Sequence, residues 1–195
     1  MKKILISFLI CVNSFAISPG DIAINFKLQG QDGKMVELYK LPKPVILEWY
    51  NEGCPFVRKH YDSNNMQETQ KFFKEQTGGT WVSIASSNKG KQGYIESSSV
   101  AKSKLREENS KADYLLLDTD GKVGQLFEAK TTPQIVYVGK DNVIKYYGAI
   151  DSIPSSSTSD IKSATNYVKE TVKSIKANEK VKVSKTKPYG CGVKY

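Results

Sequence analysis

Residues 45–61 read VILEWYNEGCPFVRKHY, and this stretch decides the fold of the chain. Residues 45–50 form a continuous apolar and aromatic run, which is typical of a central strand covered on both faces. Residues 55–76 are polar with interspersed apolar side chains, start at a proline and end before two glycines, a pattern that predicts a helix. Cys54 is therefore expected where a buried strand turns directly into a helix.

Cys54 is the candidate reactive group of the chain. At the start of a helix, a cysteine meets unpaired backbone N–H groups and the positive end of the helix dipole, and both favour the thiolate. Such a placement lowers a cysteine pKa from about 8.5 to roughly 3.5–7.5, which makes the sulfur a nucleophile near neutral pH. We expect Cys54 to be exposed at the edge of the sheet. The alternative is a buried, inert core cysteine.

Two basic residues follow Cys54 on the predicted helix. Arg58, four residues on, is expected to share a helix face with Cys54 and to add fixed positive charge. His60, the single histidine, lies six residues on and is less well aligned. We therefore expect His60 to be a surface side chain rather than a catalytic base.

The rest of the chain alternates between strand and helix patterns. Hairpins are predicted at residues 24–28 with 35–38 and at residues 134–138 with 143–147. Further core strands are predicted at residues 81–85 and 114–117, and helices at residues 100–108, 123–129 and 161–175. An exposed loop is expected at residues 86–99 and an irregular tail near the carboxyl end. This order predicts an α/β fold with a mixed central sheet flanked by helices on both faces and an N-terminal β-hairpin extension.

Residues 1–16 have the pattern of a cleaved secretory signal peptide. Lys2 and Lys3 form a positive start, residues 4–12 are apolar, and small residues stand near Ala16 at cleavage spacing. The apolar run of about nine residues is too short for a bilayer core, which needs roughly 20. We expect a periplasmic or secreted protein with no membrane association after cleavage, a single domain over residues 17–178 and a C-terminal tail over residues 179–195.

The cysteines and the charge narrow the class of protein. Cys11 lies in the predicted signal peptide, so the exported chain retains Cys54 and Cys191, and an even pair outside the cytosol suggests a structural or cycling disulfide. The net charge of +9 is spread widely, and Arg58 and Arg106 are the only arginines. No nucleic-acid partner is expected, because no arginine-rich or aromatic recognition module is present.

Residues 45–61 resemble the active-site segment of the peroxiredoxin-like branch of the thioredoxin superfamily, which is related to alkyl hydroperoxide reductase and thiol-specific antioxidant proteins. Thr132-Pro133-Gln134, residues 146–151 (YYGAID) and residues 188–195 (PYGCGVKY) are similar to that branch too. The resemblance covers essentially the whole mature chain and implies a thioredoxin fold. It also implies that Cys54 is the redox-active cysteine and that Pro133 is a cis-proline facing it.

The resemblance implies roles for several neighbours of Cys54. The residues expected to stabilise the thiolate or to face the substrate are Asn51, Pro55, Arg58, Thr132 and Pro133. Cys191 lies between two glycines, and related proteins also end in a Gly-Cys motif, so we expect the tail to bring Cys191 to Cys54 as a resolving cysteine. A permanent Cys54–Cys191 bond is the alternative.

Three positions depart from the patterns of the related families. Val57 stands where thioredoxins carry a second cysteine, so a local dithiol cannot form. Asn51 stands where peroxiredoxins carry a Thr or Ser, and Leu47 stands where they carry a Pro. These departures favour an exported thiol-disulfide oxidoreductase or a weak thiol peroxidase.

The expected partners follow from this chemistry. The substrate is a peroxide or a protein or small-molecule disulfide, and an external thiol acts as the reductant; no cofactor and no metal are expected. One alternative is a non-catalytic thioredoxin-fold binding protein that is stapled by a structural Cys54–Cys191 disulfide and uses residues 86–99 and the lysine-rich tail as contact surfaces. Another is copper capture by Cys54, Cys191 and His60.

Overall fold

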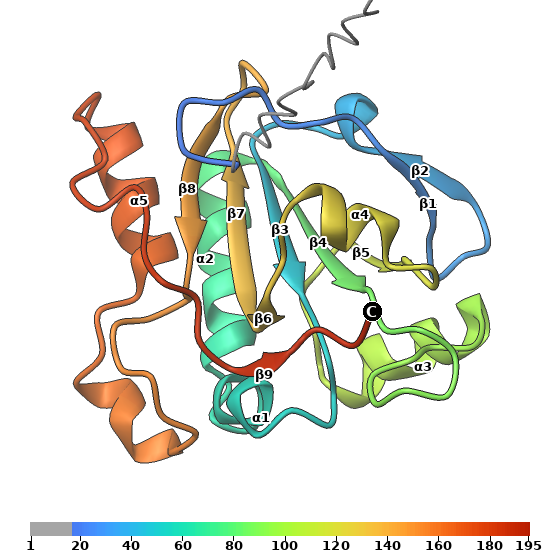
Figure 1. Cartoon of the computed structure of the whole chain (residues 1–195). Helices are drawn as coiled ribbons and strands as arrows, with labels where there is room; N and C mark the ends of the chain where they lie inside the picture. Colours follow the sequence, from blue (N-terminus) through green and yellow to red (C-terminus); the bar gives the residue numbers. More distant parts are fainter. Residues whose placement is uncertain (1–16) are drawn as a thin grey trace, which may run out of the picture.

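A mixed sheet of seven strands forms the centre of the protein (Figure 1). The structure is a computed structural model that describes residues 17–195, so the predicted signal peptide at residues 1–16 lies outside the described residues. The strands follow the order β2 (Met35–Glu37), β1 (Lys27–Gln29), β5 (Tyr114–Leu117), β4 (Thr80–Ala85), β3 (Val45–Trp49), β7 (Gln134–Val138) and β8 (Ile144–Gly148). Strands β3, β4 and β5 are parallel, and the other neighbours in the sheet pair antiparallel.

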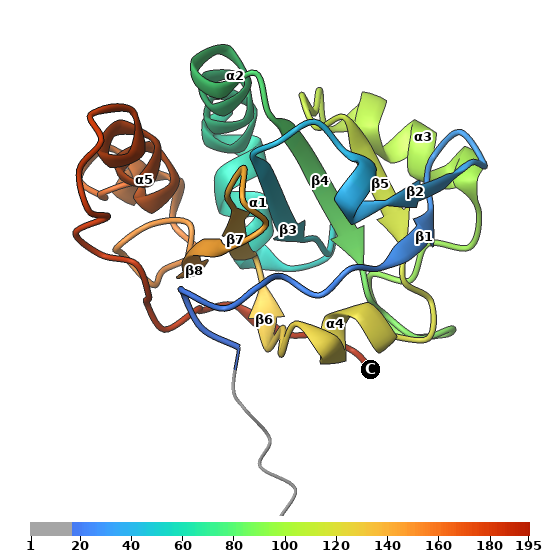
Figure 2. The same cartoon turned by 90° about the horizontal axis from the view of Figure 1, so that it is seen from above.

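Helices cover both faces of this sheet (Figure 2). One face packs against α1 (Pro55–Asp62), α2 (Asn65–Thr77), α3 (Ser98–Glu107) and α5 (Tyr167–Lys176). The other face packs against α4 (Lys122–Leu126) and the segment that precedes β1. Every residue of β3 and β4 is buried, as central parallel strands require. The predicted fold, including its N-terminal hairpin, is confirmed.

The single helix predicted over residues 55–76 is in fact two helices, α1 and α2. Asn64 between them has a left-handed backbone, with a φ of 62°. Asparagine is one of the few residues besides glycine that adopts this conformation readily, so the chain can change direction here. Cys54 therefore stands at the start of a short helix of eight residues rather than a long one.

The terminal helix α5 begins later than predicted. Its N-cap is Asn166, whose side chain accepts a hydrogen bond from the Lys169 amide. Ile161 lies in a separate 3-10 helix, η2 (Thr158–Lys162). The apolar spacing over residues 161–175 thus spans two elements, because a capping asparagine starts a new helix between them. Neither α5 nor any other helix within residues 17–195 is long and apolar enough to cross a membrane.

The C-terminal tail crosses the carboxyl ends of the central strands (Figure 1). Its strand β9 (Cys191–Gly192) pairs antiparallel with β6 (Thr131–Thr132), so that Cys191 lies opposite Thr132. Nearer to α5, the Thr186 amide donates a hydrogen bond to the Tyr147 carbonyl at 3.0 Å. The tail is therefore tied to β8 of the central sheet and, through a separate two-stranded sheet, to β6, which places Cys191 beyond the end of β3.

Candidate functional site

Cys54 is the N-cap of α1 and follows β3 after a short turn. Its carbonyl accepts hydrogen bonds from the Val57 and Arg58 amides, both at 2.9 Å. Pro55 occupies the first turn of the helix, where its missing N–H would have no partner in any case. The predicted strand-to-helix placement is confirmed, but the predicted exposure is wrong. Cys54 has 0% of its surface exposed, because β6 and β9 lie over its sulfur.

The Cys54 sulfur lies between two backbone groups. It donates a hydrogen bond to the Thr132 carbonyl at 3.1 Å and accepts one from the Cys191 amide at 3.4 Å. Cys54 and Cys191 are 137 residues apart in the sequence, and both are free thiols. The tail brings Cys191 to Cys54 as predicted, and the Thr132–Pro133 peptide bond is cis as predicted.

The two thiols have opposite pKa shifts. Burial alone raises the pKa of Cys54, but contacts of its sulfur with the Cys191 and Thr132 side chains and with the Cys191 and Val57 amides outweigh burial and lower that pKa. Burial, followed by the contact with Cys54, raises the pKa of Cys191 to about 11. Cys54 is therefore the thiol that ionises first, and Cys191 keeps its proton.

Asn51 orders the turn before Cys54. Its Oδ1 accepts a hydrogen bond from the Gly53 amide at 3.0 Å, and the residue is buried. Gln92 donates from Nε2 to the Gly53 carbonyl at 3.1 Å, and its Oε1 lies 3.4 Å from Asn51 Nδ2. Gln92 is exposed, as expected for this loop, and its side chain also contacts the turn. Sequence analysis missed Gln92, which is 39 residues from Gly53.

Arg58 is engaged with acidic partners. Its Nη2 lies 2.6 Å from Glu108 Oε2, its Nε lies 3.6 Å from Asp62 Oδ1, and its guanidinium covers the Tyr61 ring. The contacts that shift the Cys54 pKa most are hydrogen bonds from other groups. Because two carboxylates balance the charge of Arg58, these contacts do not support its predicted action on the thiolate.

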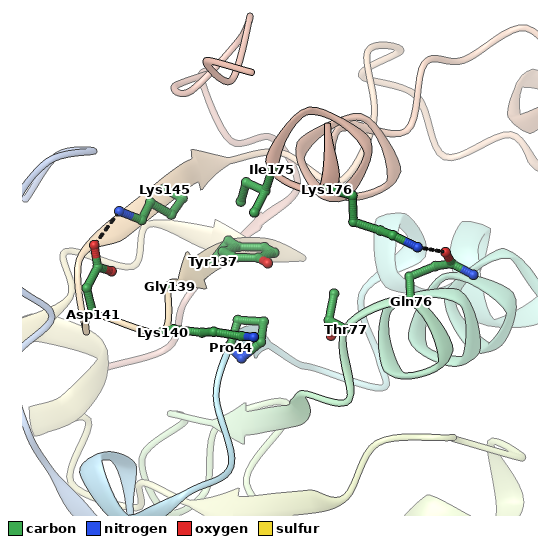
Figure 3. Close-up of a pocket in the computed structure, with 10 residues that line it drawn as sticks. All are labelled: Pro44, Gln76, Thr77, Tyr137, Gly139, Lys140, Asp141, Lys145, Ile175 and Lys176. Atoms are coloured by element: carbon green, nitrogen blue, oxygen red, sulfur yellow. Dashed lines mark hydrogen bonds and ion pairs between the residues drawn. The ribbon is translucent and has the colours of Figure 1, made fainter. Parts of the chain in front are cut away.

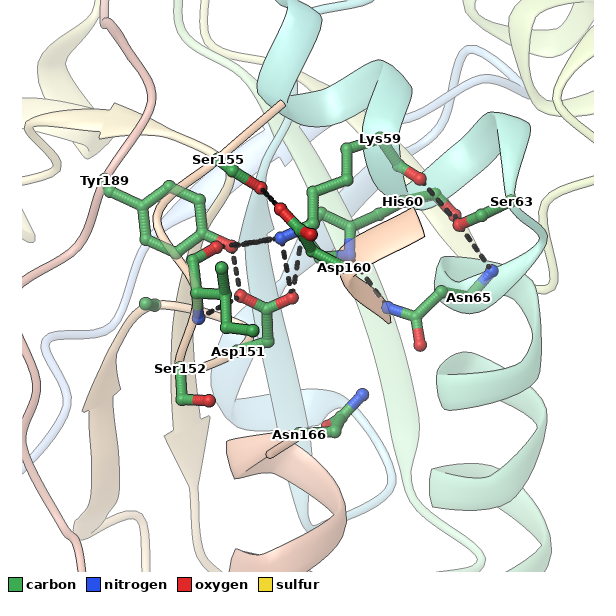
Figure 4. Close-up of polar contacts among 12 residues, drawn as sticks. Lys59, His60, Ser63, Asn65, Asp151, Ser152, Ser155, Asp160, Asn166 and Tyr189 are labelled. Atoms are coloured by element: carbon green, nitrogen blue, oxygen red, sulfur yellow. Dashed lines mark hydrogen bonds and ion pairs between the residues drawn. The ribbon is translucent and has the colours of Figure 1, made fainter. Parts of the chain in front are cut away.

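His60 is buried, with 0% of its surface exposed, so the prediction of a surface histidine is wrong. Its Nδ1 lies 2.8 Å from Asn65 Nδ2, and its Nε2 lies 3.4 Å from the Tyr189 hydroxyl and 3.9 Å from Asp151 Oδ2 (Figure 4). Burial lowers the pKa of His60 to about 4. Since Nε2 faces Asp151 and Tyr189, the copper alternative lacks its third ligand. Within residues 17–195, no three His, Cys, Asp or Glu side chains are grouped to hold a metal ion.

A buried ion pair lies beside His60. Lys59 Nζ is 3.0 Å from Asp151 Oδ2 and 2.8 Å from the Ile153 carbonyl, and the side chains of Lys59 and Asp151 are 0% and 1% exposed. The Tyr189 hydroxyl donates to the other Asp151 oxygen. We call Lys59, His60, Asp151 and Tyr189 the buried polar cluster; it joins α1 to the tail (Figure 4). This arrangement was not predicted, because its contacts join residues 92 and 130 positions apart in the sequence.

A pocket of about 410 Å³ opens at the opposite end of the sheet (Figure 3). It is lined by Pro44, which precedes β3, and by Gly139, which follows β7, whereas Cys54 and Pro133 lie at the other ends of these strands. Four of its polar side chains are engaged in two pairs: Lys145 pairs with Asp141 at 2.6 Å, and Lys176 donates to Gln76 at 2.7 Å. The pocket is separate from the cysteine site.

Comparisons with known proteins agree with this fold. The model of the AhpC/TSA family matches residues 19–147. A hypothetical protein from Sinorhizobium meliloti 1021 superposes with a TM-score of 0.73 at 17% identity, over 93% of this chain and 96% of that one. Peroxidoxin BcpB from Mycobacterium tuberculosis superposes with a TM-score of 0.58 at 20% identity, over 82% of this chain and 98% of that one. The thioredoxin domain of a thiol-disulfide oxidoreductase from Bacteroides vulgatus superposes with a TM-score of 0.52 at 17% identity, over 75% of this chain and 97% of that one. No curated protein matches by sequence.

Proposed function

The chain belongs to the AhpC/TSA family, and from this membership we propose that it is a thiol-disulfide oxidoreductase or weak thiol peroxidase. In this proposal Cys54 is the nucleophile and Cys191 is the resolving thiol. A thioredoxin-like redox function is the part that the family itself supports. The observation that carries the rest is the contact between the Cys191 amide and the Cys54 sulfur, together with the opposite pKa shifts of the two thiols.

With a disulfide substrate, the reaction has two exchanges. The Cys54 thiolate attacks one sulfur of the substrate, a Cys54–substrate disulfide forms, and the first substrate thiolate leaves. Cys191 then loses its proton and attacks the Cys54 sulfur, which releases the second substrate thiolate and forms the Cys54–Cys191 disulfide. The substrate disulfide gains two electrons, and the cysteine pair loses two.

With a peroxide substrate, the Cys54 thiolate attacks one oxygen and becomes a sulfenic acid, while the other oxygen leaves as an alcohol or as water. Cys191 then displaces the sulfenic oxygen as water and forms the same disulfide. An external thiol reductant returns both cysteines to the reduced state by exchange. Asn51 stands where peroxiredoxins carry a hydroxyl residue, which supports weak rather than efficient peroxidase activity.

The predicted neighbours of Cys54 take parts in this scheme. Asn51 and Pro55 shape the turn and the first helical residue around the sulfur. The Thr132 hydroxyl stabilises the thiolate, and Pro133 holds the Thr132 carbonyl against the sulfur. Arg58 is the weakest of the assignments, because it pairs with Glu108.

Export completes the proposal. The composition of residues 1–16 supports a signal peptide that is cleaved near Ala16, with a mature domain over residues 17–178 and the tail over residues 179–195. Outside the cytosol, a cycling cysteine pair would meet both oxidised and reduced thiols. Amino-terminal sequencing of the protein from a periplasmic fraction should begin near Ile17; retention of residues 1–16 in the cytosol would contradict export.

The thiol chemistry is tested by treating the reduced protein with glutathione disulfide or hydrogen peroxide and mapping its disulfides by mass spectrometry. We expect a Cys54–Cys191 disulfide in the unmodified chain. Cys191→Ser should stop at a Cys54–glutathione disulfide, because the resolving thiol is missing. Cys54→Ser is the matched control and should leave Cys191 largely unmodified, since the pKa of Cys191 is raised to about 11. Faster modification of Cys191 than of Cys54 would contradict the assignment.

One observation favours the second candidate, a non-catalytic binding protein reinforced by a Cys54–Cys191 bond. Cys54 has no exposed surface in the reduced structure, which is the expectation for an inert thiol. Returning the oxidised protein to reduced glutathione separates the two candidates, because a stapling disulfide would resist exchange with reduced thiols, whereas a cycling one would be reduced.

A further inference from the structure

The tail covers the Cys54 sulfur together with β6. Cys191 and Gly192 form β9 over β6, and the Val193 amide donates to the Lys130 carbonyl at 3.1 Å. Gly190 approaches so closely that a Cβ there would lie 1.9 Å from the Thr132 carbonyl oxygen. No substrate atom can reach the sulfur while this segment stays in place, because Cys54 is 0% exposed. The chemistry proposed above therefore requires the tail to move.

Tyr189 joins the tail to the buried polar cluster. Its hydroxyl donates to Asp151 Oδ1 and lies 3.4 Å from both Lys59 Nζ and His60 Nε2 (Figure 4). Its ring packs edge-on against Phe56, with ring centroids 5.9 Å apart, and also lies under the Lys59 ammonium. Tyr189 thus contacts three residues of α1, the helix that begins after Cys54.

Asp151 keeps other partners when the Tyr189 hydroxyl leaves, so its buried charge is not left unpaired. Its Oδ2 pairs with Lys59 at 3.0 Å, and its Oδ1 accepts a second hydrogen bond from the Ile153 amide at 3.1 Å. If the tyrosine hydroxyl departs, the carboxylate still has a cation and an amide donor. The bond to Tyr189 is therefore a strong bond to a charged group whose breaking leaves no unpaired buried ion.

The tail has a second tyrosine anchor of a different kind. The Tyr195 hydroxyl donates to the Ala129 carbonyl at 2.6 Å, which is a bond to a neutral acceptor. Hydrogen bonds to charged groups are the stronger class. Tyr189 also lies only two residues from Cys191, so it governs the position of β9 more directly than Tyr195 does.

We propose that Tyr189 is a positioning residue that latches the tail over Cys54, and that release of its hydroxyl from the Lys59–Asp151 pair opens the site to substrate. This latch rests on the proposed function, because it regulates access to the same thiol. It acts through Cys191 and the backbone of β9 and touches no reacting atom. The two states are a closed tail bound at Asp151 and an open tail with Asp151 still paired to Lys59.

Tyr189→Phe tests the latch, because it removes the hydroxyl and keeps the ring on Phe56. We expect alkylation of Cys54 by iodoacetamide under native conditions, followed by peptide mapping, to be about ten- to a hundredfold faster than in the unmodified chain, the factor expected for one hydrogen bond to a charged group. Hydrogen exchange should rise in peptides from residues 185–195 and stay unchanged in β3 and β4.

Tyr61→Phe is the matched control. Its hydroxyl also donates to a buried carboxylate, Glu48 Oε1, at 2.9 Å, but Tyr61 lies in α1 rather than in the tail. The control should lose comparable stability without faster alkylation of Cys54. Equal alkylation rates in Tyr189→Phe and the unmodified chain would overturn the latch, and so would equal acceleration in both variants.

The latch and the redox function can fail separately. If Tyr189→Phe brings no acceleration but glutathione disulfide still generates the Cys54–Cys191 bond, only the latch fails. If Tyr189→Phe accelerates alkylation as expected but no Cys54–Cys191 bond forms with glutathione disulfide or peroxide, the latch stands and the proposed function fails.

Discussion

The Cys54 sulfur makes two hydrogen bonds that favour different protonation states. Donation to the Thr132 carbonyl requires the thiol, whereas the Cys191 amide donates to the sulfur and favours the thiolate. The Thr132 side chain, like the Cys191 amide, favours the thiolate. Together, the contacts that favour the thiolate outweigh burial and lower the pKa of Cys54. At the scale of single residues, reactivity therefore depends on Thr132 and Cys191 as well as on the helix start.

Thr132→Val tests the contribution of the hydroxyl at nearly constant size. Among residues 17–195, the buried Thr132 Oγ1 makes no hydrogen bond, and its nearness to the Cys54 sulfur lowers the pKa of that thiol. Its loss should raise the Cys54 pKa by about one unit, as expected for one hydrogen bond to a charged group. The measurement is the pH dependence of thiolate absorbance in a Cys191→Ser background. Thr131→Val is the control, since its hydroxyl is also buried without a partner in the described chain; an equal shift there would contradict the assignment.

His60 should make the stability of the protein depend on pH. Burial lowers its pKa from 6.5 to about 4, so the folded state holds a neutral imidazole that the unfolded chain protonates below pH 6.5. The contribution of neutral His60 to the free energy of unfolding is complete above pH 6.5. It falls by about 3 kcal/mol in total as the pH decreases towards 4. Urea unfolding at a series of pH values should show a flatter free energy of unfolding for His60→Asn over this window. An identical slope in both proteins would contradict the pKa shift.

At the scale of elements, the site is made by a contact between β9 and β6 rather than by one continuous motif. Gly190 has a φ of 137° and touches the Thr132 carbonyl, so the backbone of the tail can approach only without a side chain. β6 in turn carries the Thr132 carbonyl, which accepts a hydrogen bond from the Cys54 sulfur. Cys191 lies beside Cys54 because β9 pairs with β6.

Gly190→Ala should displace the tail, because its Cβ would overlap the Thr132 carbonyl. We expect at least tenfold slower closure of the Cys54–Cys191 disulfide after addition of glutathione disulfide, equivalent to about 1.4 kcal/mol of lost alignment. Gly192→Ala is the matched control in the same strand, since the nearest atom to its added Cβ is 3.9 Å away. Equal rates of closure in the two variants would show that the register of β9 is unimportant.

Across the fold as a whole, the sequence predicts the features that depend on neighbouring residues along the chain. The buried run of β3, the proline at the start of α1 and the two hairpins are local, and all were found. The break at Asn64 was missed, because a single residue in a left-handed conformation interrupts an otherwise helical composition. The new helix start at Asn166 was missed because the apolar spacing runs across it.

The candidate site was predicted in part. Cys54, Cys191 and the cis bond at Pro133 were identified and lie together. The burial of Cys54 and the pairing of Lys59 with Asp151 were not foreseen, because they depend on segments 78 to 137 residues apart that meet only in the folded chain. Sequence patterns mark a reactive residue type, but they do not show which distant segment covers it.

The reduction potential of the Cys54–Cys191 pair shows whether the two thiols form a working redox couple. The protein is equilibrated in glutathione buffers of graded ratio, and its free thiols are trapped and counted. We predict a Cys54–Cys191 disulfide with a potential between about −270 and −120 mV, the range of dithiols that exchange with partners. A potential below about −300 mV, the value of a structural bond, or the absence of this disulfide in every buffer would show that Cys54 and Cys191 are not a working redox couple.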